Sequence, residues 1–146
     1  MPHSGDQTLI RPARLSDADA VWPLARDFAT SFTAQRGAFD SALTNLVSHA
    51  ETLLIVAVRD DVLVGYLLAS NHLTFLANGP VCWVEEVMVE TDQRRHGIGR
   101  RLMEAAELWA EDRGAAYVSL ASRRAGDFYL ALGYEDSATF FKKSLA

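Results

Sequence analysis

The sequence has a single cysteine and no long apolar run, and these absences narrow the kind of protein it encodes. Cys82 has no second cysteine with which to form an intrachain disulfide, and a lone cysteine in an apolar stretch is most often a core residue. No segment approaches the ~18 apolar residues that a membrane-spanning helix needs. The first seven residues, MPHSGDQ, lack the basic and apolar regions of a signal peptide. We therefore expect a cytoplasmic protein that has no membrane partner.

Basic residues are scarce in the first 90 positions and gather in the remainder of the chain. The whole sequence holds 14 Lys and Arg against 19 Asp and Glu, which gives a formal net charge of −5. This balance does not favour nucleic acid as a partner. The nine basic residues of the second part are residues 94, 95, 100, 101, 113, 123, 124, 142 and 143. Both an anion-binding site and a solvated basic face are compatible with this distribution.

The order of apolar periods and turn residues predicts one α/β domain over residues 1–146. Strands are expected at 8–14, 52–59, 62–70, 81–89 and 116–121, with one or two more within 134–145. Helices are expected after Ser16, from Ser41, over 98–113 and over 125–132, and turns at 60–61 and 78–80. This order, β α α β β β α β α β, predicts a mixed sheet with helices on both faces.

Residues 84–102 form the most informative stretch, because they indicate a strand, a basic glycine loop and the start of a helix. Gly97 and Gly99 allow close approach of the backbone, and the helical period begins at Ile98. A helix N-terminus presents unpaired N–H groups and the positive end of the helix dipole, which together suit an anion such as phosphate. The arginines at 94, 95, 100 and 101 add charge-assisted donors. We expect a phosphate-bearing cofactor to bind here.

Two other phosphate-binding motifs are the alternatives for this loop. No third glycine stands where G-x-G-x-x-G requires one, and no Gly-Lys-Ser/Thr follows. Both motifs also usually open on an early strand, whereas this loop comes late in the chain. The arginines are not interleaved with aromatic residues, so binding to single-stranded nucleic acid is not indicated either.

The loop resembles the Gln/Arg-x-x-Gly-x-Gly/Ala signature of the GCN5-related N-acetyltransferase (GNAT) superfamily, which Arg94, Gly97 and Gly99 match. The resemblance covers almost the whole chain. It implies the GNAT acyl-CoA N-acyltransferase fold, with a central mixed, mostly antiparallel sheet, and acetyl-CoA as the cosubstrate. No residues have the spacing of metal ligands, and we expect no metal.

The resemblance also implies which residues contact the cofactor. The backbone of the strand would pair with the pantetheine arm, and the loop amides would hold the pyrophosphate. Ser122 stands where many members carry an Asn that contacts the cofactor arm. The implied residues are Val87, Met88, Val89, Arg94, Arg95, His96, Gly97, Ile98, Gly99, Arg100 and Ser122.

A second segment, AGDFYLALGY at 125–134, resembles the family pattern A-x-x-F-Y-x-x-x-G-F. The family's tyrosine falls on Tyr129, which implies a general acid that protonates the departing CoA thiolate. The alternative is that Tyr129 only packs.

The attacking amine needs a base, and Glu85 and Glu86 are the candidates. Neighbouring side chains on a strand face opposite ways, so one of the pair should face the cleft. The pair resembles an acidic dipeptide of several small-amine acetyltransferases. We favour Glu85 as the base and Glu86 as the contact to the substrate cation; the reverse assignment, and an ion pair of one of them with an arginine, stay open.

The expected activity is transfer of an acetyl group from acetyl-CoA to a primary amine, by direct attack in a ternary complex. An acetyl-enzyme is disfavoured because Cys82 lacks a paired His at a recognisable spacing. The alternative function is a catalytically inactive acyl-CoA-binding sensor or interaction domain. The acceptor is a small-molecule or peptide amine, and a homodimer stays open. Aromatic and acidic residues that could hold the amine, or belong to the core, are Trp22, Asp27, Phe28, Phe32, Phe39, Asp40 and Tyr66.

Overall fold

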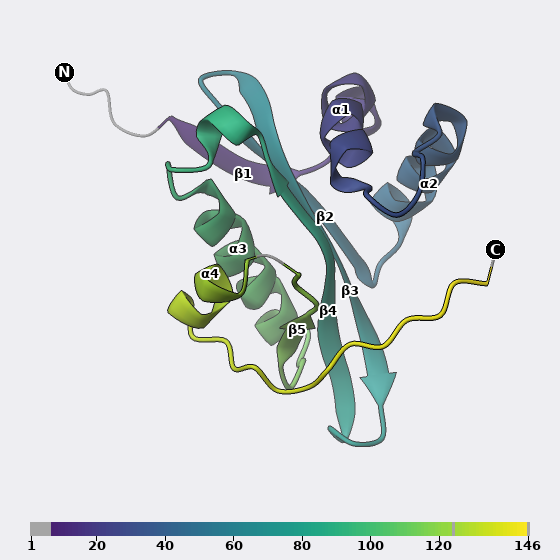
Figure 1. Ribbon diagram of the computed structural model, residues 1–146, viewed down its shortest axis with the longest axis vertical. Helices are drawn as coiled ribbons and strands as arrows, with labels where there is room; N and C mark the ends of the chain where they lie inside the picture. Colours follow the sequence, from purple (N-terminus) through teal and green to yellow (C-terminus); the bar gives the residue numbers. More distant parts are fainter. Residues whose placement is uncertain (1–6, 124, 146) are drawn as a thin grey trace.

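The computed structural model describes residues 7–123 and 125–145, so Arg124 and both chain ends lie outside the described residues (Figure 1). Its centre is a five-stranded sheet in the order β1-β2-β3-β4-β5. The strands β1 to β4 pair antiparallel with one another, and β5 is parallel to β4. The predicted mixed, mostly antiparallel sheet is therefore confirmed. The strands are β1 (Thr8–Pro12), β2 (Thr52–Arg59), β3 (Val62–Thr74), β4 (Gly79–Val89) and β5 (Val118–Leu120).

Helices cover both faces of this sheet, as the sequence predicts. One face carries α1 (Ala18–Phe28) and α2 (Arg36–Ser48), and the other carries α3 (Ile98–Asp112) and the short α4 (Gly126–Ala131) (Figure 1). No helix in the described part of the chain is long and apolar enough to cross a membrane. Single 3-10 turns precede α1 and α3, at Leu15–Asp17 and Thr91–Gln93.

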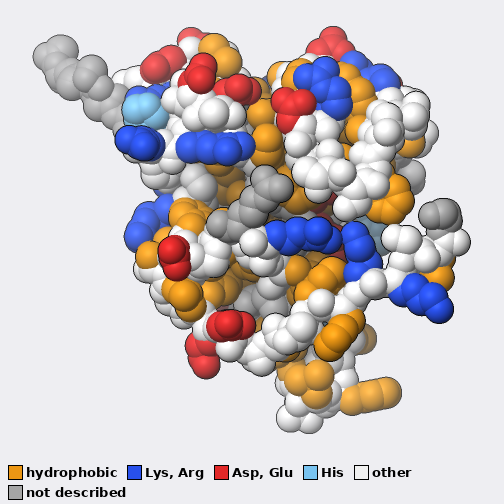
Figure 2. All heavy atoms as spheres, in the orientation of Figure 1, with side chains coloured by type: hydrophobic (Ala, Val, Ile, Leu, Met, Phe, Trp, Pro, Cys, Tyr) orange, Lys and Arg blue, Asp and Glu red, His pale blue; other side chains and the backbone are white. Residues whose placement is uncertain are grey.

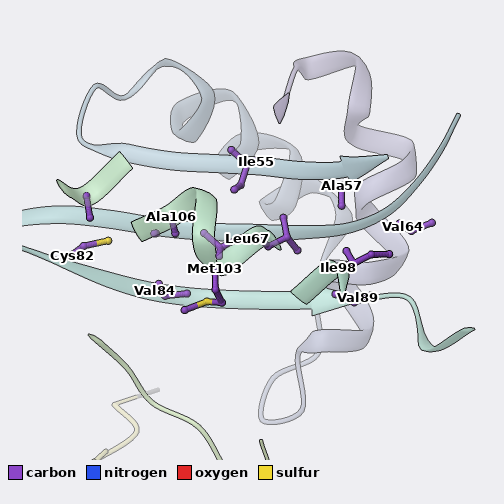
Figure 3. Packing of buried hydrophobic residues seen from close by; sticks show 13 residues of the cluster. Ile55, Ala57, Val64, Leu67, Cys82, Val84, Val89, Ile98, Met103 and Ala106 are labelled. Carbon is purple, nitrogen blue, oxygen red and sulfur yellow. The ribbon is translucent and has the colours of Figure 1, made fainter. Parts of the chain in front are cut away.

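The larger core lies between α3 and the sheet (Figure 3). Side chains alternate along each strand apart from the bulges, so one face of β2, β3 and β4 is directed at α3. Leu67 of β3 meets Ile98, Leu102 and Met103 of α3, and all four are fully buried. Full burial of such side chains contributes about 1.5–3 kcal/mol each. This packing holds the start of α3 in a fixed position relative to the end of β4.

The buried cluster on the opposite face is smaller. Val21 and Leu24 of α1 pack there against Val56 of β2 and Tyr66 of β3. Part of the space between the two helices and the sheet is not filled by side chains. A cavity of about 400 Å³ remains there.

The turn predicted at 60–61 is present, whereas the turn predicted at 78–80 lies at residues 75–78, because Gly79 and Pro80 already belong to β4. Asp60 and Asp61 have φ of 52° and 67°, so the two residues that join β2 to β3 both lie in the left-handed region that a tight hairpin needs. Asn78 has φ of 59° in the turn between β3 and β4. Aspartate and asparagine tolerate this region better than most residues with a side chain.

A bulge in β4 opens the sheet at the candidate site. Val84 pairs with Ala69 and Glu86 pairs with Leu68, so Glu85 has no residue opposite it. On the other side, β5 pairs with β4 only from Cys82 to Val84. From Glu85 onward, the edge of β4 that faces β5 is therefore unpaired.

Two expectations are wrong. No strand forms within 135–145; this segment is irregular and exposed, and Phe140 stacks on Trp83 with ring centroids 6.4 Å apart. A half-buried strand needs apolar and polar residues in alternation, and the run FFKK at 140–143 does not have it. The second helix begins at Arg36 and not at Ser41, because the ion pairs of Arg36 with Asp40 and Asp19 help offset the ~1 kcal/mol that Gly37 costs within a helix.

Candidate active site

The glycine loop ends in a helix N-terminus that suits an anion. Gly97 is the N-cap of α3. Its φ of 72° lies in the left-handed region, which residues with a side chain rarely adopt. The N–H of Arg101 bonds to the carbonyl of Gly97 at 3.1 Å and begins the hydrogen bonding of the helix. The N–H groups of Ile98, Gly99 and Arg100 precede that bond and have no carbonyl within the helix. The predicted loop geometry is therefore present.

Two of the four loop arginines have structural roles. Arg94 donates from Nε to the carbonyl of Val89 at 2.9 Å, which ties the loop back to the end of β4. Arg101 donates to the carbonyl of Thr8 at 2.9 Å and so joins α3 to β1. These contacts make both side chains part of the frame that supports the loop.

The other two arginines are available for an anion. Arg95 and Arg100 are exposed, and neither has an ion-pair partner among residues 7–123 and 125–145. His96 lies between them in the loop, is exposed, and donates its backbone N–H to Gln93 O at 3.4 Å. Figure 2 shows basic side chains and a histidine gathered on the side of the molecule where α3 begins.

The second signature glycine is explained by packing. A Cβ placed on Gly99 would lie 3.2 Å from the ring of Phe128, which is on α4. Gly99 thus lets α4 sit against the first turn of α3. Phe128 in turn makes an edge-to-face contact with Tyr129, with centroids 5.0 Å apart. Sequence reasoning missed this role of Phe128, although it belongs to the recognised pattern.

The open edge of β4 offers backbone groups to a ligand. Glu90 donates its N–H to Val64 on β3 at 2.7 Å. Because backbone groups alternate along an antiparallel pair, those of Met88 also face β3, whereas those of Val87 and Val89 face the open edge. The carbonyl of Val89 is already occupied by the loop arginine. Of the three predicted strand residues, Val87 and Val89 are therefore placed to contact an extended ligand, and Met88 is not.

The structure separates the two glutamates. Glu86 is half-buried and lines the cavity beneath α1 and α2, whereas Glu85 is the exposed bulge residue and does not line it. The hydroxyl of Tyr66, which is 2% exposed, donates to Glu86 Oε1 at 2.7 Å. Burial raises the pKa of Glu86, the bond from Tyr66 partly opposes this, and the charge of Glu85 adds to it. Glu86 is thus an acidic group with an environment suited to taking up a proton.

Tyr129 lies on the other face, where it packs against the core beneath α3. Its ring is half-buried against Phe128 and Tyr134, with the latter centroid 6.0 Å away, and burial raises its pKa. No residue in the described part of the chain forms a hydrogen bond with its hydroxyl. Tyr134, by contrast, donates its hydroxyl to Glu107 at 2.6 Å. The phenol of Tyr129 therefore stays protonated near neutral pH, and its hydroxyl is free to donate to a ligand.

The remaining candidates divide between local structure, the cavity and the surface. The hydroxyl of Ser122 accepts the N–H of Ala125 at 3.1 Å, so it is engaged locally, just before α4. Trp22 and Phe39 line the cavity, with centroids 5.4 Å apart. Phe28 at the end of α1 and Phe32 in the segment between α1 and α2 are exposed and do not line it.

Cys82 belongs to the core beneath α3. The thiol is fully buried, and burial raises its pKa to about 11. A thiol in that state is a poor nucleophile at neutral pH.

Comparison with known proteins agrees with this geometry. Residues 18–134 match the model of the Acetyltransferase (GNAT) family. The chain belongs to the GNAT family. The match spans the fold from α1 to the aromatic residue that follows α4, so it includes the cavity, the bulge, the glycine loop and Tyr129.

Individual GNAT relatives are similar over most of their length. An uncharacterized N-acetyltransferase of Bacillus subtilis (strain 168), YhfO, is 27% identical over 138 residues, which are 90% of this chain and 92% of that protein. The crystal structure of glucosamine-6-phosphate N-acetyltransferase from Arabidopsis thaliana has a TM-score of 0.84 at 18% identity, covering 95% of this chain and 99% of that one. Aminoglycoside N-acetyltransferase AAC(6')-Iy in complex with CoA has a TM-score of 0.83 at 18% identity, covering 99% and 100%. The two structures show that the fold is shared.

Proposed function

We propose that this GNAT protein transfers an acetyl group from acetyl-CoA to a primary amine by direct attack in a ternary complex. One observation carries the proposal: a half-buried carboxylate, Glu86, lines a cavity and sits on β4 next to the open edge of that strand. The cavity can hold an acceptor, and the open edge can hold a donor. The named activities of the relatives support the same reaction class.

The residues present fit the cofactor that this family implies. When bound, acetyl-CoA supplies an activated acetyl group as a thioester. The N–H groups at the start of α3 and the exposed side chains of Arg95 and Arg100 would hold its pyrophosphate. Val87 and the N–H of Val89 would hold its extended arm, like a short added strand.

Glu86 is proposed as the base, in place of the initial preference for Glu85. A primary amine is protonated at neutral pH and cannot attack until it loses a proton. Glu86 accepts that proton, and its raised pKa brings it nearer to the working pH. The hydrogen bond from Tyr66 fixes the orientation of the carboxylate.

Tyr129 is proposed as the acid. As the nitrogen bonds to the acetyl carbon and the carbon–sulfur bond breaks, the Tyr129 hydroxyl gives its proton to the sulfur and regains one through solvent. The nitrogen releases its second proton to solvent water as the amide forms. Cys82 is buried with its pKa raised, which supports direct attack without an acetyl-enzyme. A single catalytic domain in the cytoplasm is part of the proposal.

Two measurements test the proposal against the alternative of an inactive CoA-binding sensor. Acetyl-CoA should raise the melting temperature of the protein, because it binds the native state. Release of free thiol should then depend on the presence of an amine. Binding without thiol release for any amine would indicate the sensor.

Tyr129→Phe tests the acid. Loss of the proton donor should lower kcat by about 10- to 1000-fold, and the affinity for CoA should change little because the ring is kept. The affinity is measured by isothermal titration calorimetry. Loss of CoA binding in parallel with kcat would indicate that Tyr129 only supports the cofactor site by packing.

A further inference from the structure

The cavity that holds Glu86 is mainly apolar. It lies between α1, α2 and the sheet, and has a volume of about 400 Å³. Alanines of both helices and of the segment between them form part of its walls. The larger apolar side chains on its walls include Trp22, Phe39, Leu43, Leu46, Leu54 and Leu68. Such walls favour an apolar ligand, because they gain nothing from contact with hydroxyl or ammonium groups.

Among the described residues that line this cavity, Glu86 is the only acidic one. The other polar side chains there are neutral, and they include Thr33, Gln35 and Tyr66. The Tyr66 hydroxyl already donates to Glu86. The cavity therefore offers one site for a cation, and any further ammonium group inside it would lack a partner.

Carboxylates close to the cavity do not supply a second cation site. Arg36 bonds to Asp40 at 2.9 Å and to Asp19 at 2.7 Å. Its guanidinium carbon lies 5.9 Å from the ring centroids of both Trp22 and Phe39, which line the cavity. The side chain beside these two aromatic walls is thus a cation whose two acidic neighbours are already engaged. Both carboxylates are already bound to Arg36, so neither is left unpaired to receive a second ammonium group.

We propose that the acceptor is a primary monoamine with an apolar body, either an alkyl chain or an aryl group on a short chain. This inference rests on the proposed function and specifies its substrate class. The amine lies at Glu86, and the body lies among the apolar walls. Polyamines and aminoglycosides, which carry several ammonium groups, are poor acceptors for the same reasons. Each methylene that the cavity buries should raise kcat/KM by about fourfold until the cavity is full.

A matched pair of amines gives the sharpest test. Hexylamine and hexamethylenediamine have the same chain, and the diamine adds one ammonium group at the far end. We expect kcat/KM for hexylamine to exceed that for the diamine by at least about tenfold, with phenethylamine close to hexylamine and kanamycin lowest. Turnover of the diamine or kanamycin at an equal or higher kcat/KM would overturn the inference and leave the acetyltransferase function standing.

Binding separates this inference from the catalytic proposal. Each amine is titrated by calorimetry into the protein saturated with CoA, so that no acetyl transfer occurs. Tighter binding of hexylamine than of the diamine, without turnover of either in the acetyl-CoA assay, would retain the monoamine pocket and overturn the proposed enzyme. Absence of both hexylamine binding and turnover would overturn the monoamine pocket.

A variant locates the body of the acceptor. Ala42 lines the cavity from α2, and Ala42→Leu fills part of it with a residue that favours helix. We expect kcat/KM for hexylamine to fall by at least about tenfold. The loss for propylamine should be smaller, because only the longer chain reaches the part of the cavity that the new leucine occupies. Ala20→Leu, on an exposed position of α1 that does not line the cavity, is the matched control. Equal kcat/KM for hexylamine in the two variants would place the acceptor elsewhere.

Discussion

The two faces of the sheet are built from the same strands and differ in how completely they are packed. On the α3 face, thirteen buried residues form one continuous core that reaches from β2 to the start of α3. On the α1 and α2 face, four buried residues lie beside a cavity that contains a carboxylate. The first face holds the start of α3 and the glycine loop in place. The second face leaves a cavity with Glu86 and Tyr66 on its wall, where the proposed acceptor would bind.

The largest expected effect concerns catalysis on the cavity face. Glu86→Gln keeps the shape and a hydrogen bond to Tyr66 but removes the base, so kcat/KM should fall by about 10²- to 10⁴-fold. The assay is amine-dependent thiol release, with CoA affinity measured alongside. Glu85→Gln, at the exposed bulge, is the comparison, and an equal loss in that variant would reverse the assignment of the base.

A pair of leucines compares the stability that each face provides. Leu102 is fully buried beneath α3, so Leu102→Ala should lower the free energy of unfolding by about 2–5 kcal/mol. Leu46 is half-buried and borders the existing cavity, so Leu46→Ala should cost clearly less. Urea denaturation monitored by circular dichroism measures both. Equal losses would show that the two faces contribute alike to the fold.

The contact between α3 and α4 is tested at Gly99. Gly99→Ala places a methyl group 3.2 Å from the Phe128 ring, so the ring and α4 must shift by a few tenths of an ångström; we expect that strain to exceed the ~1 kcal/mol by which Ala favours a helix over Gly, and so to leave a net loss of stability. The displacement of α4 should also lower kcat, because Tyr129 lies on the same helix. Gly126→Ala is a control, since a Cβ there meets nothing within 4 Å. An unaffected Gly99→Ala protein would show that α4 adapts freely.

The smallest effect is a shift in pH dependence. The bond from Tyr66 lowers the pKa of Glu86, so its loss in Tyr66→Phe should raise that pKa further. Because the base acts when ionised, the fall of kcat/KM toward acidic pH should begin at a higher pH in the variant. Tyr117→Phe, with its ring on the exposed surface, serves as the control. A shift in the acidic direction would contradict the role of Tyr66.

Local patterns in the sequence were sufficient for most of the fold. Alternation in β2, β3 and β4, the helical period of α3, and the aspartates and asparagine of the hairpins all act over a few residues, so they are visible without tertiary contacts. The start of α2 was misplaced because the ion pair from Arg36 to Asp19 spans 17 residues of sequence. The strand predicted near the C-terminus does not form. Residues 135–145 include apolar side chains, but these do not alternate with polar ones in the way that gives a strand one buried face.

The sequence by itself predicted the family, a candidate phosphate loop and the candidate acidic and phenolic groups, because these depend on residue type and short spacing. Only the tertiary structure decided which of these groups can act. The bulge in β4 places Glu86 in the cavity and Glu85 outside it. Arg94 bonds back to Val89, and Arg101 bonds to Thr8 at the far end of the sequence. Neither side chain is therefore available at the candidate phosphate site. Strand register, the path of the loop and the long-range contact of Arg101 with Thr8 make these choices, and residue type and spacing alone do not reveal them.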